Sequence, residues 1–133
     1  MRVFTDANVL VSSFSFEGVT RRLVALLVES HEIIVSPQVI EEFRRVSTEK
    51  IGVDPQKIDA FLQEFIKTVE VIMPPYEERL DVRDPNDIDI LAAAIKANAD
   101  VLVSGDKDLL EFKESPIPVM KPRALYDLLV GGT

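Results

Sequence analysis

Short β-branched segments alternate with longer amphipathic segments along the chain, and this alternation limits the fold more than any other feature of the sequence. Five segments rich in Val, Ile and Leu are predicted as strands, at residues 3–5, 33–36, 69–73, 101–104 and 119–121. Hydrophobic residues recur at helical spacing between them, which predicts helices at 20–29, 38–48, 56–68, 85 to about 98, and 107–112. Because strands separated by long helices need crossover connections, we predict an α/β fold: a three-layer α/β/α sandwich with a mainly parallel central sheet of about five strands.

Two helix starts are marked by an aspartate that precedes a proline. Asp54-Pro55 and Asp84-Pro85 each place a capping side chain before a proline at the first helical position. The segment 7–19 is expected to be a loop between the first strand and the first helix. No linker or internal repeat divides the chain, so residues 1–133 are predicted to form a single domain.

Composition narrows the class of protein. Hydrophobic residues make up 47% of the chain, which suffices for a core, and the longest apolar runs are too short to span a membrane. We therefore expect a cytoplasmic protein. Leucines recur at helical spacing at Leu125, Leu128 and Leu129, and we assign this stripe to the core in preference to an interface. The chain has no cysteine and one histidine, which excludes zinc sites built from thiolates or several histidines.

The net charge of −8 argues against a protein that coats duplex DNA nonspecifically. An acidic surplus has two explanations, which are surface solubility and carboxylates that hold a divalent cation. The positions of the acids favour carboxylates that hold a divalent cation. Asp6 directly follows the first strand, Asp106 follows the fourth, and Glu42 and Asp87 lie in helices that follow strands. Because the carboxyl ends of parallel strands meet at one edge of the sheet, these four acids are predicted to converge.

Helix geometry separates two of these acids from their acidic neighbours. Glu42 lies about 90° from the centre of the apolar face of its helix, whereas Glu41 lies about 170° away, in solvent. Asp87 lies about 80° and Asp89 about 120° from the centre of the next apolar face. Each acid also has a structural explanation, as a cap, a complement to the helix dipole or a solvated charge. Asp6 fits these explanations least, because an unpaired carboxylate beside a buried strand is costly.

Four segments, in this order, resemble motifs of the PIN domain, the nuclease fold of many toxins of toxin–antitoxin pairs. They are DANVL at 6–10, SPQVIEEF at 36–43, RDPND at 83–87 with the apolar residues after it, and VLVSGDKDLL at 101–110. The resemblance spans nearly the entire chain. It implies a PIN-like fold and a VapC-like endoribonuclease that depends on one or two Mg²⁺ or Mn²⁺ ions. Its catalytic and metal-binding residues would be Asp6, Glu42, Asp87 and Asp106, whose oxygen atoms suit such hard cations.

Three further residues are assigned supporting positions around the acids. Asn8 and Ser104 are candidates for hydrogen bonds that orient the acids or bound waters. Asp108 is either a further ligand or a cap of the short helix, and the cap is favoured. Ala7 and Ser104 stand where the family usually has threonine. The absent hydroxyl at position 7 leaves the orientation of Asp6, or of a bound water, partly unsupported, and activity can be reduced as a result.

An acidic site needs positive charge nearby if it is to hold RNA. Arg21, Arg22, Arg44 and Arg45 are candidates for phosphate contacts, although an ordinary solvated helix face is the favoured explanation for them. The resemblance also implies partners: an RNA substrate, a cognate antitoxin protein that blocks the acidic site with a basic segment, and a second copy in a homodimer. The alternative function is a noncatalytic PIN-fold module that binds RNA or protein, and the presence of all four acids argues against it.

Overall fold

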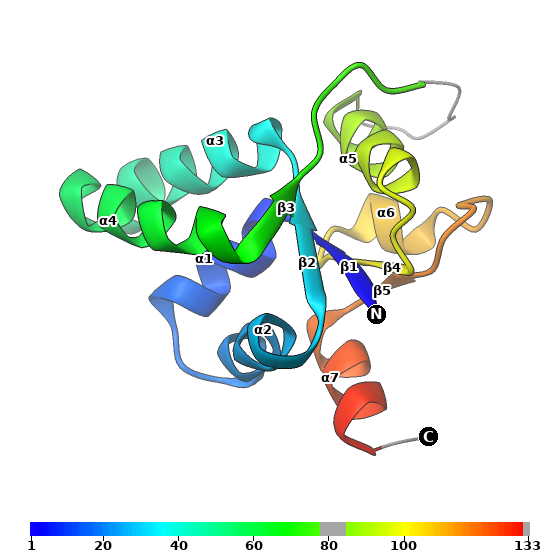
Figure 1. Cartoon of the computed structure of the whole chain (residues 1–133), viewed down its shortest axis with the longest axis horizontal. Coiled ribbons are helices and arrows are strands. Elements are labelled where there is room, and N and C mark those ends of the chain that lie inside the picture. Colours follow the sequence, from blue (N-terminus) through cyan, green and yellow to red (C-terminus); the bar gives the residue numbers. More distant parts are fainter. Residues whose placement is uncertain (78–84, 132–133) are drawn as a thin grey trace.

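Five parallel strands form one sheet in the order β3-β2-β1-β4-β5 (Figure 1). The structure is a computed structural model that describes residues 1–77 and 85–131. The strands are β1 (Arg2–Thr5), β2 (Glu32–Val35), β3 (Val69–Val71), β4 (Val101–Val103) and β5 (Val119–Met120). In the register of the sheet, Val3 lies between Ile33 of β2 and Val101 of β4. The predicted parallel sheet is confirmed, and β1 lies at its centre.

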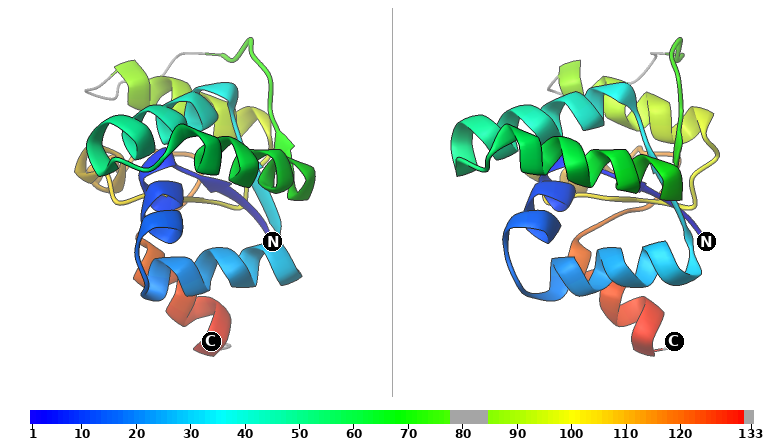
Figure 2. Two further views of the ribbon diagram at one scale, coloured as in Figure 1. Left: turned by 90° about the vertical axis from the view of Figure 1, so that its left-hand side faces the viewer. Right: turned by 60° about the vertical axis from the view of Figure 1, so that its left-hand side comes forward.

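The helices cover both faces of the sheet. They are α1 (Ala7–Ser15), α2 (Val19–Ser30), α3 (Pro37–Val46), α4 (Pro55–Phe65), α5 (Pro85–Lys96), α6 (Lys107–Glu111) and α7 (Pro122–Gly131). A π-helical turn, η1 (Ser47–Ile51), follows α3, and a 3₁₀ turn, η2 (Ile66–Thr68), follows α4. Helices α1–α4 lie on one face, which the left view of Figure 2 shows from the front, and α5 and α6 lie on the other (Figures 1 and 2). This division is the one that right-handed crossovers produce for this strand order. The predicted three-layer sandwich is therefore confirmed.

The expectation of a loop over the segment 7–19 is wrong, because helix α1 occupies most of it. Asp6 is its N-cap, and the Asp6 side chain accepts a hydrogen bond from the backbone N–H of Ala7. The three residues Val9, Leu10 and Val11 are buried in the core. The helix propensity of β-branched valine and of serine is low, so the burial of these side chains stabilises a helix that local preference alone does not favour.

The start of α4 agrees with the sequence, whereas α3 and α4 end two and three residues earlier than predicted, where π-helical and 3₁₀ turns follow them. The Asp54 side chain accepts a hydrogen bond from the backbone N–H of Gln56 at the start of α4, as the capping pattern predicts. Asp84 lies outside the described residues. In α7, Leu125 is fully buried as predicted, but Leu128 is 38% exposed. Over residues 1–77 and 85–131, the structure contains no helix with the length and apolar character needed to cross a bilayer.

Candidate metal centre at the carboxyl edge of the sheet

The direction of the chain across the sheet reverses at β1. The chain leaves β1 towards β2 and β3 on one side, and it later returns to β4 and β5 on the other side. The carboxyl ends of β1 and β4 therefore lie at the switch point of the sheet, which is where the topology of α/β proteins places a ligand-binding crevice. Asp6 directly follows β1 and Asp106 follows β4 by three residues, so both acids lie at this point.

Asp6 is buried, and each of its two carboxylate oxygens accepts a hydrogen bond. Only 3% of its surface is exposed. Its Oδ1 atom accepts from the backbone N–H of Ala7 at 2.6 Å, and its Oδ2 atom accepts from the Ser104 hydroxyl at 2.7 Å. Burial raises the pKa of Asp6 above its ordinary value of 3.8; the hydrogen bonds oppose this rise, and the negative charge of Asp106 adds to it. Both oxygens of Asp6 thus have donors even though position 7 has no hydroxyl, so Asp6 itself is oriented. The effect of Ala7 on a bound water and on activity stays a prediction.

Ser104 connects the two acids of the crevice. Its side chain is fully buried, and its Oγ atom donates to Asp6 while it accepts from the backbone N–H of Asp106 at 3.0 Å. The hydrogen bond with an acid that we expected from Ser104 is present. The Asn8 side chain is exposed, and its backbone N–H acts on Asp6, so the role of the side chain around bound ions stays a prediction.

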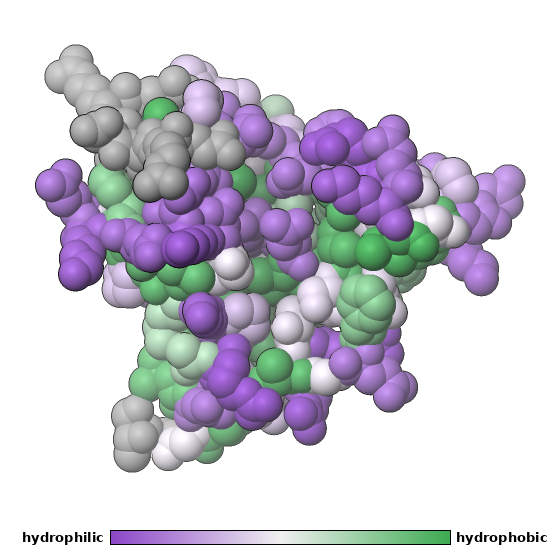
Figure 3. All heavy atoms as spheres, turned by 180° about the vertical axis from the view of Figure 1, so that it is seen from behind, coloured by the Kyte–Doolittle hydropathy of each residue, from purple (hydrophilic) through white to green (hydrophobic). Residues whose placement is uncertain are grey.

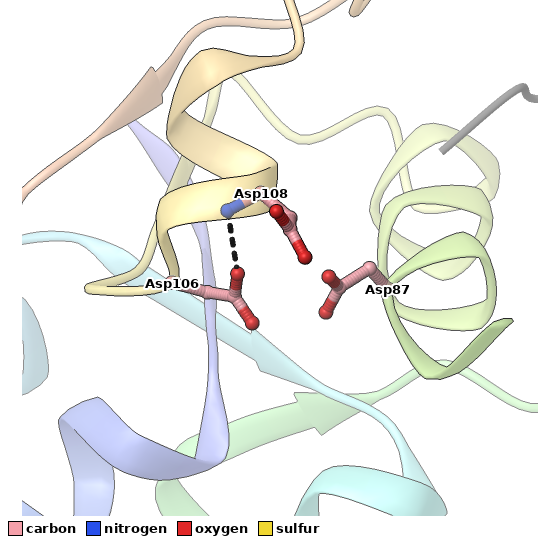
Figure 4. Close-up of side chains that lie close together, drawn as sticks. All are labelled: Asp87, Asp106 and Asp108. Carbon is pink, nitrogen blue, oxygen red and sulfur yellow. Dashed lines mark hydrogen bonds between the residues drawn. The ribbon is translucent and has the colours of Figure 1, made fainter. Parts of the chain in front are cut away.

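Three carboxylates meet between α5 and α6. Asp87 projects from the first turn of α5, and Asp106 and Asp108 project from the start of α6 (Figure 4). One oxygen of each residue lies within 4.8 Å of the others. We call Asp87, Asp106 and Asp108 the acidic cluster. The Asp106 carboxylate is also the N-cap of α6, since it accepts from the backbone N–H of Asp108 at 2.8 Å. The cap is therefore Asp106, and Asp108, which we favoured as a cap, directs its carboxylate towards Asp87.

The acidic cluster has the chemistry of a site for a hard divalent cation. Two negative charges about 4 Å apart repel each other by about 4 kcal/mol at an effective dielectric constant of about 20, and a cation between them reverses the sign of this interaction. Carboxylate oxygens are the ligands that Mg²⁺ and Mn²⁺ prefer. Asp87 is only 3% exposed, so part of this charge is removed from solvent. The residues present therefore fit such an ion.

Glu42 lies apart from the acidic cluster. Among the described acids, the group whose oxygens lie within 4.8 Å contains neither Glu42 nor Asp6. The Glu42 side chain on α3 is 29% exposed and lies 3.8 Å from the guanidinium of Arg45, whereas Glu41 is 66% exposed. The helix-face estimate thus distinguishes the two glutamates correctly. It does not supply the distance between Glu42 and the other acids, because that distance depends on how α3 packs.

All four arginines considered for RNA binding have partners within the protein. Arg21 donates to the carbonyl oxygens of Ser13 and Phe14 at 3.0 Å, Arg22 lies 5.9 Å from the ring centre of Tyr126, Arg44 pairs with Asp59 at 3.2 Å, and Arg45 pairs with Glu41 at 3.6 Å. Arg21 therefore fixes the end of α1, and Arg22 joins α2 to α7. The ion pairs of Arg44 and Arg45 are exposed. These contacts agree with the structural explanation favoured for the arginines.

Comparison with known proteins agrees with this architecture. A family model described as a PIN domain matches residues 2–108. The fold is similar to that of VapBC2 from Rickettsia felis, solved bound to a DNA fragment from its promoter, with a TM-score of 0.64, 23% identity, and coverage of 91% of this chain and 98% of that chain. It is also similar to a PilT N-terminus domain protein from Sulfolobus solfataricus P2, with a TM-score of 0.57, 15% identity, and coverage of 95% and 91%. No curated protein sequence gives a significant match. The family match covers most of the sequence and all four acids, and the chain belongs to the PIN domain family.

Proposed function

We propose that this protein is an endoribonuclease that hydrolyses RNA phosphodiester bonds with one or two Mg²⁺ or Mn²⁺ ions. The observation that carries the proposal is the acidic cluster, in which carboxylate oxygens from two helices lie within 4.8 Å of one another. Its position in the crevice beside β1 and β4 is where a ligand of an α/β protein binds. Membership of the PIN domain family supports a nuclease, and hence a hydrolase.

The proposed roles of the acids follow from their positions. Asp87, Asp106 and Asp108 hold the cation directly, and Asp6 contributes from the end of β1, where Ser104 fixes its orientation. Glu42 is the fourth acid implied by the family motifs and acts from α3. The chemistry that such a cation supplies when bound is the activation of a water and the neutralisation of charge on the phosphate. No side chain of the protein needs to act as the nucleophile.

Two of the arginines remain candidates for contacts with RNA phosphates. Arg44 and Arg45 lie on α3, the helix that also carries Glu42. Their ion pairs with Asp59 and Glu41 are exposed and are worth about 1 kcal/mol or less, so a phosphate can replace the carboxylate at little cost. Arg21 and Arg22 are weaker candidates, because their guanidinium groups join elements of the fold.

A toxin role would add a protein partner. Similarity to VapBC2, together with motifs that resemble those of toxins, supports an antitoxin that binds this protein, and a homodimer is part of the same proposal. Several large hydrophobic side chains are exposed: Phe16, Val28, Ile51, Ile66, Met73, Leu128 and Val130. The rear view in Figure 3 shows hydrophobic patches between hydrophilic side chains, so the surface offers apolar area to a partner. Co-expression with the antitoxin followed by co-purification tests this part of the proposal, and a monomer that captures no antitoxin would contradict it.

The proposed activity is tested by incubating purified protein with structured and single-stranded RNA in Mn²⁺, in Mg²⁺ or in EDTA. Asp6→Asn removes one acid, and Asp127→Asn is the matched control, because Asp127 is 61% exposed on α7. We expect the wild type and the control to cleave RNA only with metal, and the Asp6→Asn variant to lose cleavage. Cleavage in EDTA, or unchanged cleavage by Asp6→Asn, would contradict the assignment. Cleavage of no RNA would favour the noncatalytic binding module.

A further inference from the structure

A recess separate from the acidic cluster lies between the start of α3, the segment after β3, and the first turns of α5. It has a volume of about 410 Å³ and is lined by Pro37, Gln38, Pro74, Pro75, Tyr76 and Asp89. Figures 1 and 2 show these three elements close together at the end of the molecule where β2 and β3 terminate. None of the residues that line the recess belongs to the acidic cluster.

Contacts hold the Tyr76 side of the recess in place. The Tyr76 hydroxyl donates to the carbonyl oxygen of Ile72 at 2.8 Å, which fixes the ring. The Lys96 ammonium group lies 5.7 Å from the ring centre of Tyr76 and donates to the carbonyl oxygens of Met73 and Pro75 at 2.7 and 3.1 Å. Tyrosine rings are surfaces on which unpaired RNA bases stack, and the three prolines of the recess add apolar area beside the ring.

Two polar groups of the recess are available to a ligand. The Asp89 carboxylate and the Gln38 amide are both half-buried. Neither group forms a hydrogen bond or an ion pair with another part of the chain that the structure describes. Asp89 is near enough to Tyr76 for its negative charge to add to the effect of burial, which raises the pKa of Tyr76. The carboxylate therefore lies beside the ring on which a base would stack, and its charge excludes a phosphate from the same place.

This combination of groups matches the Watson–Crick edge of guanine. Guanine offers two neighbouring donors, N1–H and the N2 amino group, to the two oxygens of one carboxylate, and its O6 atom accepts from an amide N–H₂. Adenine, cytosine and uracil do not present two adjacent donors beside an acceptor. A carboxylate, an amide and one aromatic ring thus favour guanine over the other three bases.

The recess shares two helices with candidate acids of the proposed active site, α3 with Glu42 and α5 with Asp87. Gln38 and Glu42 are four residues apart on α3 and so share one face of the helix. Asp89 and Asp87 are two residues apart at the start of α5 and point to different sides of the helix, Asp87 towards the acidic cluster and Asp89 towards the recess. We propose that this recess binds a guanine base of single-stranded RNA beside the cleaved bond and sets the sequence preference of the enzyme. This inference rests on the proposed ribonuclease function.

Binding can be measured without cleavage. Labelled uridine hexamers that carry one guanine, one inosine or one adenine are titrated in Mg²⁺ with an Asp106→Asn protein, and fluorescence anisotropy reports the affinity. We expect the guanine RNA to bind about tenfold more tightly than the adenine RNA, and the inosine RNA to fall between them because it lacks the N2 amino group. Asp89→Asn in the same background removes the preference for guanine, whereas Asp127→Asn keeps it. Undetectable binding, equal binding of the guanine and adenine RNAs, or a preference that survives Asp89→Asn would overturn the inference.

Cleavage by the protein without the Asp106→Asn change separates this inference from the proposed function. In Mn²⁺, the ratio of kcat/KM for the guanine RNA to that for the adenine RNA is expected to be about ten and to fall towards one in Asp89→Asn. Metal-dependent cleavage that ignores guanine overturns the inference alone. A guanine preference in binding without cleavage by the wild type overturns the ribonuclease function and keeps the guanine-binding site.

Discussion

The two edges of the sheet carry negative charge in different ways. At the amino edge, the guanidinium of Arg2 pairs with Glu32 and Glu70 and also donates to the carbonyl oxygen of Ala97. At the carboxyl edge, Asp6 and Asp106 are connected by the hydroxyl of Ser104, and three carboxylates of the acidic cluster crowd together. At the amino edge, the acids thus pair with a positive charge of the protein itself, the Arg2 guanidinium. At the carboxyl edge, the negative charges lie close together, and a bound cation would balance them. We therefore assign the acids of the amino edge to stability and those of the carboxyl edge to function.

The largest effect is expected from Asp106→Asn. Asparagine caps helices as well as aspartate does, so α6 keeps its start while the acidic cluster loses a charge. Metal-dependent RNA cleavage should fall by about 100-fold or more, and the melting temperature in EDTA should not decrease. Initial rates and circular dichroism melts measure both quantities. Full activity in this variant would show that the acidic cluster is not the site of metal binding.

The next effect is expected from Ser104→Ala. Removal of the hydroxyl abolishes two hydrogen bonds: the one that Ser104 donates to Asp6 and the one that it accepts from the backbone N–H of Asp106. Cleavage should fall by about 10- to 100-fold, as for groups that orient metal ligands, and stability should fall by about 1–3 kcal/mol. Ser104→Thr is the matched control, because it keeps the hydroxyl and should retain most of the activity. If alanine and threonine behave alike, Ser104 does not orient the acids.

Arg2→Met tests the opposite edge. The change removes two exposed ion pairs and the hydrogen bonds to Ala97, so the free energy of unfolding should fall by about 1–2 kcal/mol. Cleavage per folded molecule should remain unchanged, because Arg2 lies at the far edge of the sheet. Urea denaturation and cleavage rates on the same preparation check both statements. A loss of activity without a loss of stability would contradict the division between the two edges.

The smallest effect concerns pH and the metal-free protein. Because burial raises the folded-state pKa of Asp6 above 3.8, its carboxylate destabilises the fold at neutral pH. This cost is absent below pH 3.8 and complete above the folded-state pKa. In EDTA, Asp6→Asn should therefore gain stability relative to the wild type as the pH rises, by less than Arg2→Met loses. Thermal melts across this range test the sign, and a variant that is less stable only at neutral pH would show that it is wrong.

Much of the fold could be predicted because strands and helices differ in the period of their hydrophobic residues. The five strands and most helices follow this rule. Helix α1 does not, since Val9, Leu10 and Val11 have the local character of a strand and become helical through their burial. The Asp6 cap and the helical spacing of Leu10 and Phe14 were the only local signals of this helix.

The site could be predicted only in part, for a similar reason. Asp6 and Asp106 follow strands, so the topology of a parallel sheet brings them to one crevice. The direction of the Asp108 side chain depends on where α5 packs against α6, and local sequence does not contain that information. The same holds for the recess lined by Tyr76 and Asp89, because its walls come from three separate elements. Two neighbouring acids could be told apart from the sequence only where their positions on one helix differ in exposure, as for Glu41 and Glu42.

The central claim is that the acidic cluster binds a divalent cation, and the most direct measurement is the melting temperature of the protein in Mn²⁺ and in EDTA. An ion that binds only the folded state stabilises it by about 2.7 kcal/mol at 100 times its Kd. We predict that Mn²⁺ raises the melting temperature of the wild type and of Asp127→Asn, and that it does not raise that of Asp106→Asn. No rise in the wild type, or an equal rise in Asp106→Asn, would contradict the claim.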